Sequence, residues 1–181
     1  MGITEFLSSL EASSLAARIR ESLLLFPMLE SFHVLAFSVV FGTIAIIDLR
    51  LLGVASTRRP FTRIANDVLK WTWTAFGFTA VTGALMFTTN AGVYYHNSYF
   101  RAKMALLLLA GINMLVFELT AARSVRHWDK DESAPLAGKA VAALSLLLWI
   151  SIIFFGRWIG FTTSRVSRPT NDINIEDLLP K

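Results

Sequence analysis

The chain has 181 residues, of which 54% are hydrophobic and only 17% are charged. This balance is typical of a protein embedded largely in lipid rather than of a soluble domain. The absence of cysteine excludes disulfides, iron–sulfur clusters and thiolate-ligated metals. The formal charge of +4 does not indicate a nucleic acid partner, because basic residues of membrane proteins gather in cytoplasmic loops.

The first 27 residues predict an amphipathic helix that lies in the membrane interface. Its apolar side chains recur at helical spacing, with Ser, Glu and Arg between them. These apolar side chains are Phe6, Leu10, Leu15, Ile19 and Leu23. We expect Pro27 to break the chain direction before the first membrane span begins.

Four apolar blocks follow, and each can cross a hydrocarbon layer of about 30 Å as a helix. We expect spans at residues 28–53, 69–90, 100–122 and 136–161, with surface loops at 54–70 and 90–99. In the second span, Ala75, Thr79 and Gly83 recur every four residues and predict a smooth face that packs inside the bundle.

The predicted fold class is therefore all-α, an integral membrane four-helix bundle with an N-terminal interfacial amphipathic helix. Its segments are the interfacial helix (1–27), the domain of four transmembrane helices (28–161) and a polar C-terminal tail (162–181).

Lysine and arginine in the loops predict the orientation in the membrane. The first and third connections carry Arg58, Arg59, Arg63, Arg123, Arg126 and Lys130, whereas the loop at 90–99 carries none. Because positive loops stay in the cytoplasm, we expect both termini on the outer side. The chain is thus predicted to be a multi-pass protein of the bacterial inner (cytoplasmic) membrane with both termini in the periplasm.

A polar cluster is predicted at the outer ends of the spans. The first and third spans run parallel in an up-and-down bundle, so His33 and Lys103 lie at similar depth. The other members of the predicted cluster are Glu30, His96, Arg101 and Arg157. An ionisable group inside a span costs about 2.5–3.5 kcal/mol, which marks these residues as functional or as paired. Neutral imidazole is a ligand for haem iron and for copper. The structural alternative is that His33 completes a polar network with Glu30 and Arg157.

His96 has two alternative roles in this prediction. It supplies a second axial ligand from its loop or joins His33 at a copper site, with Met28 or Met104 as further ligands. Otherwise it is a solvated loop histidine.

A second group of charges is predicted at the inner ends of the first and third spans. Asp48, Arg50, Glu118 and Arg123 lie there at one depth, where opposite charges offset each other's desolvation. A structural clamp is the favoured interpretation. A proton path between the two polar clusters, passing Asn113, is the alternative.

Two levels of resemblance add to this interpretation. The runs L-E-S-F-H-V-L-A-F (29–37), I-D-L-R-L-L-G (47–53), R-A-K-M-A-L-L-L-L-A-G-I-N (101–113) and G-R-W-I-G (156–160) resemble a family of small, uncharacterised bacterial four-helix membrane proteins. The chain is also distantly similar to HemJ-type protoporphyrinogen oxidases and CopD-like copper proteins, which place a histidine early in the first span. The HemJ-type proteins also have a lysine early in the third span. In this chain, His33 and Lys103 match that histidine and lysine. This resemblance implies an axial haem ligand at His33 and a propionate or substrate partner at Lys103.

The leading hypothesis is a haem b-binding membrane protein in electron transfer or porphyrin-linked redox chemistry. A copper-handling or transport-accessory protein is the second, and a non-catalytic subunit that anchors or assembles a larger complex is the third. No soluble-enzyme motif such as a phosphate loop or a zinc-binding H-E-x-x-H pair is present, and catalysis stays open. The expected partners are the lipid bilayer and a periplasmic or membrane protein, with a homo-oligomer as a further alternative.

Overall fold

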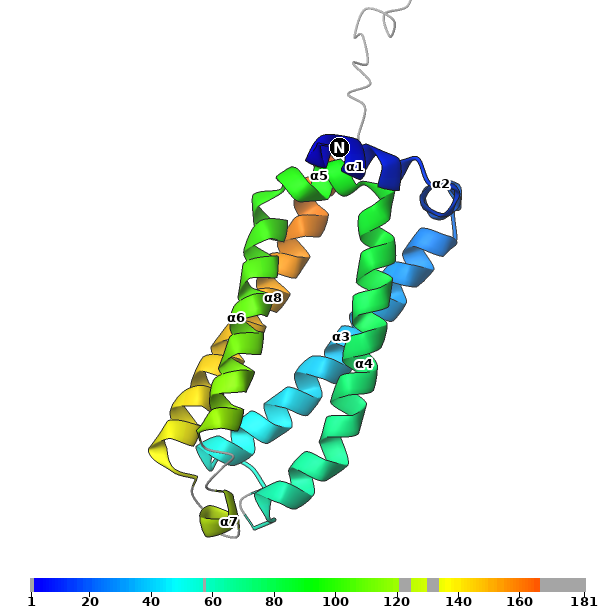
Figure 1. Ribbon diagram of the computed structural model, residues 1–181. Helices are drawn as coiled ribbons and strands as arrows, with labels where there is room; N and C mark the ends of the chain where they lie inside the picture. The colour runs from blue at the N-terminus through cyan, green and yellow to red at the C-terminus, as the bar shows by residue number, and fades with distance from the viewer. Residues whose placement is uncertain (1, 57, 121–124, 130–133, 167–181) are drawn as a thin grey trace, which may run out of the picture.

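The computed structural model describes residues 2–56, 58–120, 125–129 and 134–166, and its regular elements within these ranges are all helical. Four long helices dominate the molecule and run the length of it (Figure 1). They are α3 (Leu25–Leu52), α4 (Phe61–Thr89), α6 (Ser98–Leu119) and α8 (Leu136–Val166). The predicted all-α class is confirmed.

Three of these helices, α3, α6 and α8, are long and apolar enough to cross a membrane. Many of their large apolar side chains face outward, among them Leu35, Leu108 and Leu147, which are each more than 60% exposed. Such surfaces suit lipid rather than water. The chain therefore has the character of a membrane protein. Helix α4 is longer than α6 but is more polar, and it is not among the three candidate spans found in the described residues.

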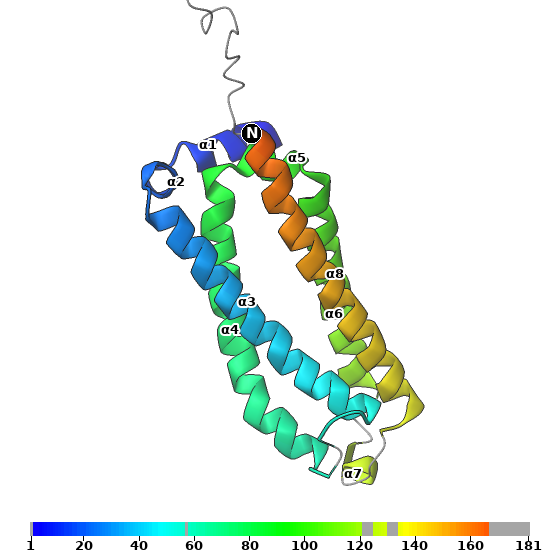
Figure 2. The ribbon, with the colours of Figure 1, turned by 180° about the vertical axis from the view of Figure 1, so that it is seen from behind.

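Helix α3 packs against α4 on one side and against α8 on the other, and α8 packs against α6. Helices α4 and α6 are not among the pairs that pack closely in the described part of the chain. Figures 1 and 2 accordingly show two helix pairs, α3 with α4 and α6 with α8, which are joined where α3 meets α8. The central core lies at this junction and consists of Val40, Ala110, Leu148, Trp149 and Ile152.

Short helices close the two ends of the bundle (Figure 2). At one end lie α1 (Ile3–Glu11), α2 (Ser14–Glu21) and α5 (Ala91–His96), and at the other lies α7 (Val125–Trp128). The N-terminal segment, predicted as one helix, forms two helices because Ser13 caps the second: its hydroxyl accepts a hydrogen bond from the Ala16 amide at 3.2 Å.

The N-terminal helices are tied to the bundle by two long-range hydrogen bonds. The Glu11 carboxylate accepts from the Gly92 amide at 2.7 Å and links α1 to α5. The Arg20 guanidinium donates to the Thr89 carbonyl at 3.0 Å and links α2 to the last turn of α4. The predicted interfacial segment is therefore a docked part of the fold.

Several helix boundaries differ from the sequence prediction. Helix α3 begins at Leu25, ahead of Pro27. Proline is tolerated in the first turn of a helix, because the backbone amides there make no hydrogen bond within the helix. Helix α3 ends at Leu52 and is capped by Gly53, whose φ of 77° is the left-handed conformation that favours glycine. Helix α8 continues past Phe161 to Val166, and the rest of the predicted tail lies outside the described residues.

The two predicted loops are partly helical. Residues 54–70 were expected on the surface as a loop, but α4 begins within them at Phe61. Residues 90–99 contain α5 and the first residues of α6, where the Asn97 side chain accepts from the Tyr99 and Phe100 amides. Polar residues near a membrane surface extend helices when a cap is available, and hydropathy alone does not reveal the cap.

The first turn of α4 is capped by a residue far away in the sequence. Pro60, which precedes the helix, provides no capping side chain. Instead, the Asp129 carboxylate accepts from the Thr62 amide at 2.7 Å and from the Thr62 hydroxyl at 2.9 Å. The Asp129 carbonyl accepts from the Phe61 amide at 3.0 Å. These bonds satisfy amides that the helix itself cannot satisfy.

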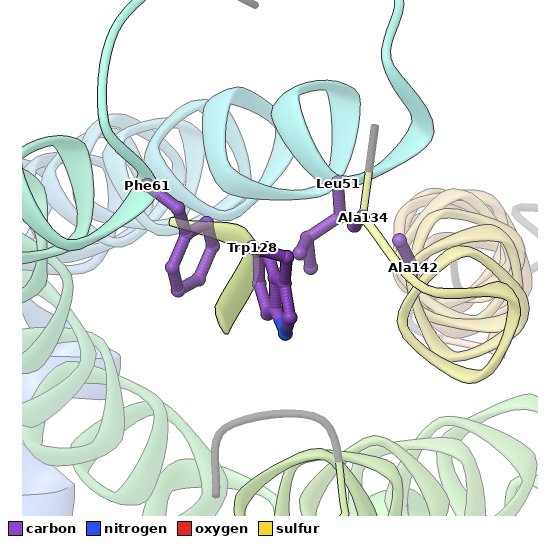
Figure 3. Close-up of a cluster of buried hydrophobic side chains, with 5 residues drawn as sticks. All are labelled: Leu51, Phe61, Trp128, Ala134 and Ala142. Atoms are coloured by element: carbon purple, nitrogen blue, oxygen red, sulfur yellow. The ribbon is translucent and has the colours of Figure 1, made fainter. Parts of the chain in front are cut away.

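A hydrophobic cluster lies beside this cap and joins α3, α4, α7 and α8 (Figure 3). Its buried members are Leu51, Phe61, Trp128, Ala134 and Ala142. The Phe61 and Trp128 rings lie 5.2 Å apart between centroids. Trp128 of α7 and Ala134, which precedes α8, thus pack together with Leu51 at the end of α3.

We predict that Asp129→Ala lowers the free energy of unfolding by about 1 kcal/mol, because the amides of the first turn of α4 lose their cap. Chemical denaturation in mild detergent measures this difference. Asp129→Asn keeps an acceptor oxygen and should recover most of the loss, and Asp67→Ala on the exposed face of α4 is the matched control. Equal stability of Asp129→Ala and Asp67→Ala would contradict the capping role.

Candidate functional site

His33 lies on α3 and contacts α4. Its Nδ1 atom lies 2.9 Å from the hydroxyl oxygen of Thr82, which is only 3% exposed. The ring covers Gly83 so closely that a Cβ atom at that position would lie 3.0 Å from His33 Cε1. The other small residues of this face, Ala75 and Thr79, are also turned inward. The face that Ala75, Thr79 and Gly83 form on α4 thus packs inward, as their spacing predicts.

The surroundings of Thr82 indicate which nitrogen of His33 carries the ring proton. The Thr82 oxygen lies 2.9 Å from the Phe78 carbonyl and 3.2 Å from the Thr79 carbonyl. A hydroxyl has one proton, and these carbonyl oxygens can only accept it. We therefore infer that Nδ1–H of His33 donates to Thr82. The Nε2 atom then carries the free electron pair, as an imidazole ligand requires.

Lys103 approaches the same region from α6. Its ammonium lies 5.7 Å from the centre of the Phe37 ring, and a Cβ atom at Gly156 of α8 would lie 3.5 Å from its Nζ atom. The charge of Lys103 acts electrostatically on His33. No acidic group among the described residues acts on Lys103 in return. Lys103 is therefore a half-buried cation whose charge no carboxylate of the described residues offsets.

Phe37 connects these two residues. Its ring is stacked with that of His33 at 6.5 Å between centroids and lies 5.7 Å from the Trp149 ring of α8. We call His33, Phe37, Thr82, Lys103 and Trp149 the His33 site. All four long helices contribute to it, and α3 contributes the central pair.

Two other predicted site residues lie elsewhere. His96 is exposed on α5, and its Nδ1 atom lies 2.8 Å from the Gly92 carbonyl of the same helix. Arg157 is exposed on α8, with its guanidinium 5.0 Å from the centre of the Phe161 ring. The described contacts bring neither residue to His33. No group of three or more His, Asp or Glu side chains that could hold a metal occurs in the described ranges, and the copper site stays a prediction.

Glu30 is exposed on α3 and acts on Tyr94 of α5 rather than on His33. The Tyr94 ring lies 5.7 Å from that of Phe100 and 6.3 Å from that of Phe87. Burial of the phenol, together with the negative charge of Glu30, raises the pKa of Tyr94.

The predicted inner charges are dispersed over different partners. Asp48 is buried and interacts with the Ser145 hydroxyl of α8. Arg50 is fully buried and donates to the Arg59 carbonyl at 3.0 Å and, more weakly, to that of Asp129 at 3.5 Å. Asp48 thus contacts α8, whereas these two bonds of Arg50 reach the residues that flank α4 and α7.

The remaining residues of the inner group do not extend it. Glu118 is exposed on α6, and Arg123 lies outside the described residues. Asn113 is buried and donates to the Val141 carbonyl at 3.1 Å, which is a bond between α6 and α8. The structural clamp of inner charges thus stays a prediction. Asn113 joins two helices, as an amide side chain in the middle of a span commonly does.

A family model described as a family of unknown function, DUF6644, matches residues 24–162. The chain belongs to this family. No match was found among curated proteins or among solved structures. These comparisons give no support to the similarity to HemJ-type oxidases and CopD-like proteins.

Sequence reasoning missed Thr82, Phe37 and Trp149 as parts of the site. A signal for Thr82 was available, because it adjoins Gly83 on the small-residue face. Phe37 lies one helical turn after His33 and therefore shares its face. Nothing in the sequence pattern distinguishes Trp149 from other apolar residues of its span.

We predict that Gly83→Ala lowers the free energy of unfolding by about 1–3 kcal/mol, because the added methyl group displaces a ring held by Thr82 and Phe37. Gly77→Ala on the same helix is the control, since nothing lies within 4 Å of a Cβ atom there, and it should leave stability unchanged or slightly raised. Denaturation of both variants in detergent makes the comparison. An equal response would show that His33 is not held against α4.

We also predict a loss of stability at alkaline pH that originates at Tyr94. Because its pKa is raised in the folded state, the unfolded chain loses this proton first. The stability is therefore complete below the ordinary tyrosine value of about 10 and falls as pH rises through the raised pKa. Phenolate absorbance, taken as the difference from Tyr94→Phe, measures the pKa. Glu30→Gln should lower it, and an unchanged value would exclude an interaction between these residues.

Proposed function

We propose that this chain is a haem b-binding integral membrane protein that acts in electron transfer or porphyrin-linked redox chemistry. The observation that carries the proposal is the 2.9 Å contact between Nδ1 of His33 and the Thr82 hydroxyl. From this contact we infer that Nε2 carries the free electron pair that would bind iron. Histidines that ligate metals nearly always have such a partner on the other ring nitrogen, because it fixes both the tautomer and the ring orientation.

The residues of the His33 site fit the chemical groups of haem b. His33 would hold the haem iron through its imidazole. Lys103, which no acidic group of the described residues offsets, is the partner for a negatively charged propionate. The rings of Phe37 and Trp149 provide apolar aromatic surface beside both residues. When bound, haem supplies one-electron chemistry, while the protein sets the ligation, the burial and the local charge.

We further propose that α4 is the fourth membrane span. Its first residues carry Arg63, Asp67 and Lys70, whereas residues 71–89 carry no charge. As a helix this uncharged segment measures about 28 Å, which matches the hydrocarbon layer. With four spans, the basic loops place both termini in the periplasm of a bacterial inner membrane.

The experiment is an absorption spectrum, oxidised and reduced, of full-length protein produced with haem supply and purified gently. We expect a Soret band in the wild type and its loss in His33→Ala. Thr82→Val should weaken haem binding by about 10- to 100-fold, as removal of a hydrogen-bond partner of a metal ligand commonly does. Lys103→Met should weaken binding while it keeps the band.

The control is His96→Ala, which replaces an exposed histidine bonded within its own helix and should keep the full band. Circular dichroism and size-exclusion chromatography establish that each variant is folded. A folded wild type without a Soret band would overturn the proposal. So would a band that survives in His33→Ala. Metal analysis after copper exposure and co-purification of a partner would then test the other two hypotheses.

A further inference from the structure

Asp48 is a carboxyl group enclosed within a helix that can cross a membrane. It lies on α3 near the end that adjoins α7 and is only 5% exposed. The Ser145 hydroxyl of α8 interacts with it, and Ser145 is itself 9% exposed. The second carboxyl oxygen, Oδ2, is buried and has no hydrogen-bond partner. The Ser145 interaction therefore involves Oδ1.

Among the described residues, no nearby cation offsets a charge on Asp48. Arg50, two residues further along α3, directs its guanidinium to the carbonyls of Arg59 and Asp129. The other charged groups at this end of the described long helices are Arg63, Asp67 and Lys70 of α4, Glu118 of α6 and Lys139 of α8. In the described residues, only burial and the Ser145 hydroxyl act appreciably on Asp48.

An ionised carboxylate in such a place is costly. Burial of a charge without a partner costs so much free energy that the group neutralises instead. A bound metal cation would need several oxygen ligands, and the described residues contain no cluster of acidic or histidine side chains that supplies them. A proton needs one carboxyl oxygen, which Oδ2 provides.

We propose that Asp48 is a reversible proton-binding site within the bundle, with the proton on Oδ2 near neutral pH. The site is separate from the His33 site, because the two residues are about 22 Å apart along α3 at 1.5 Å per residue. Its occupancy does not depend on a bound haem. The inference therefore goes beyond the proposed function and can fail or succeed without it.

Dicyclohexylcarbodiimide, an apolar reagent that adds to protonated carboxyl groups, tests the proposal. Full-length protein in lipid nanodiscs is labelled at a series of pH values, and the modified residue is located by peptide mass spectrometry. We expect an adduct on Asp48 near neutral pH. The yield should fall by about tenfold for each pH unit above the titration midpoint. Labelling is repeated with and without haem supply and should be the same.

Two variants complete the test. Asp48→Asn removes the adduct, whereas Glu118→Gln, which replaces an exposed carboxylate on the neighbouring α6, leaves it unchanged. Because asparagine resembles the neutral acid, Asp48→Asn should also fold with a thermal midpoint close to that of the wild type. Absence of an Asp48 adduct at every pH at which the wild type is folded would overturn the proposal, and so would misfolding of Asp48→Asn.

Discussion

The packing of α3 against α4 on one side and α8 on the other is the interaction on which the rest of the structure depends. Helices α4 and α6 do not pack closely in the described part of the chain, so α3 holds the two helix pairs together. The core residue Val40 and the aromatic ring of Phe37 lie where α3 meets α8. A change on α3 therefore acts on both pairs at once.

This arrangement places two ionisable residues of α3 in different surroundings. His33 contacts α4 through the Thr82 hydroxyl and the Thr79 backbone. The tautomer that we infer leaves Nε2 with a free electron pair. Asp48 contacts α8, where Ser145 meets one carboxyl oxygen and leaves the other without a partner. Since polar groups are costly inside an apolar bundle, a partly satisfied group is retained either for a ligand or for a proton. The two proposals follow from this single argument.

Much of the architecture could be predicted from the apolar blocks and their flanking residues. The depth argument for parallel spans placed His33 near Lys103, and the structure shows an electrostatic interaction between them. The same argument grouped Arg157 with them, but depth does not determine which way a side chain points around its helix. Arg157 instead lies over Phe161. The cap of α4 by Asp129 and the partner of His33 depend on contacts between distant segments, which periodicity within one segment does not reveal.

The tautomer of His33 is the central claim of this account, because the proposed iron site requires an Nε2 atom that carries a free electron pair. Nitrogen NMR of the histidine-labelled protein in nanodiscs, with the His33 signal assigned by its loss in His33→Gln, measures it directly. We predict a neutral ring with the proton on Nδ1. Thr82→Val should abolish the single-tautomer signal. A ring with its proton on Nε2 would contradict the account, since that nitrogen could then not bind iron.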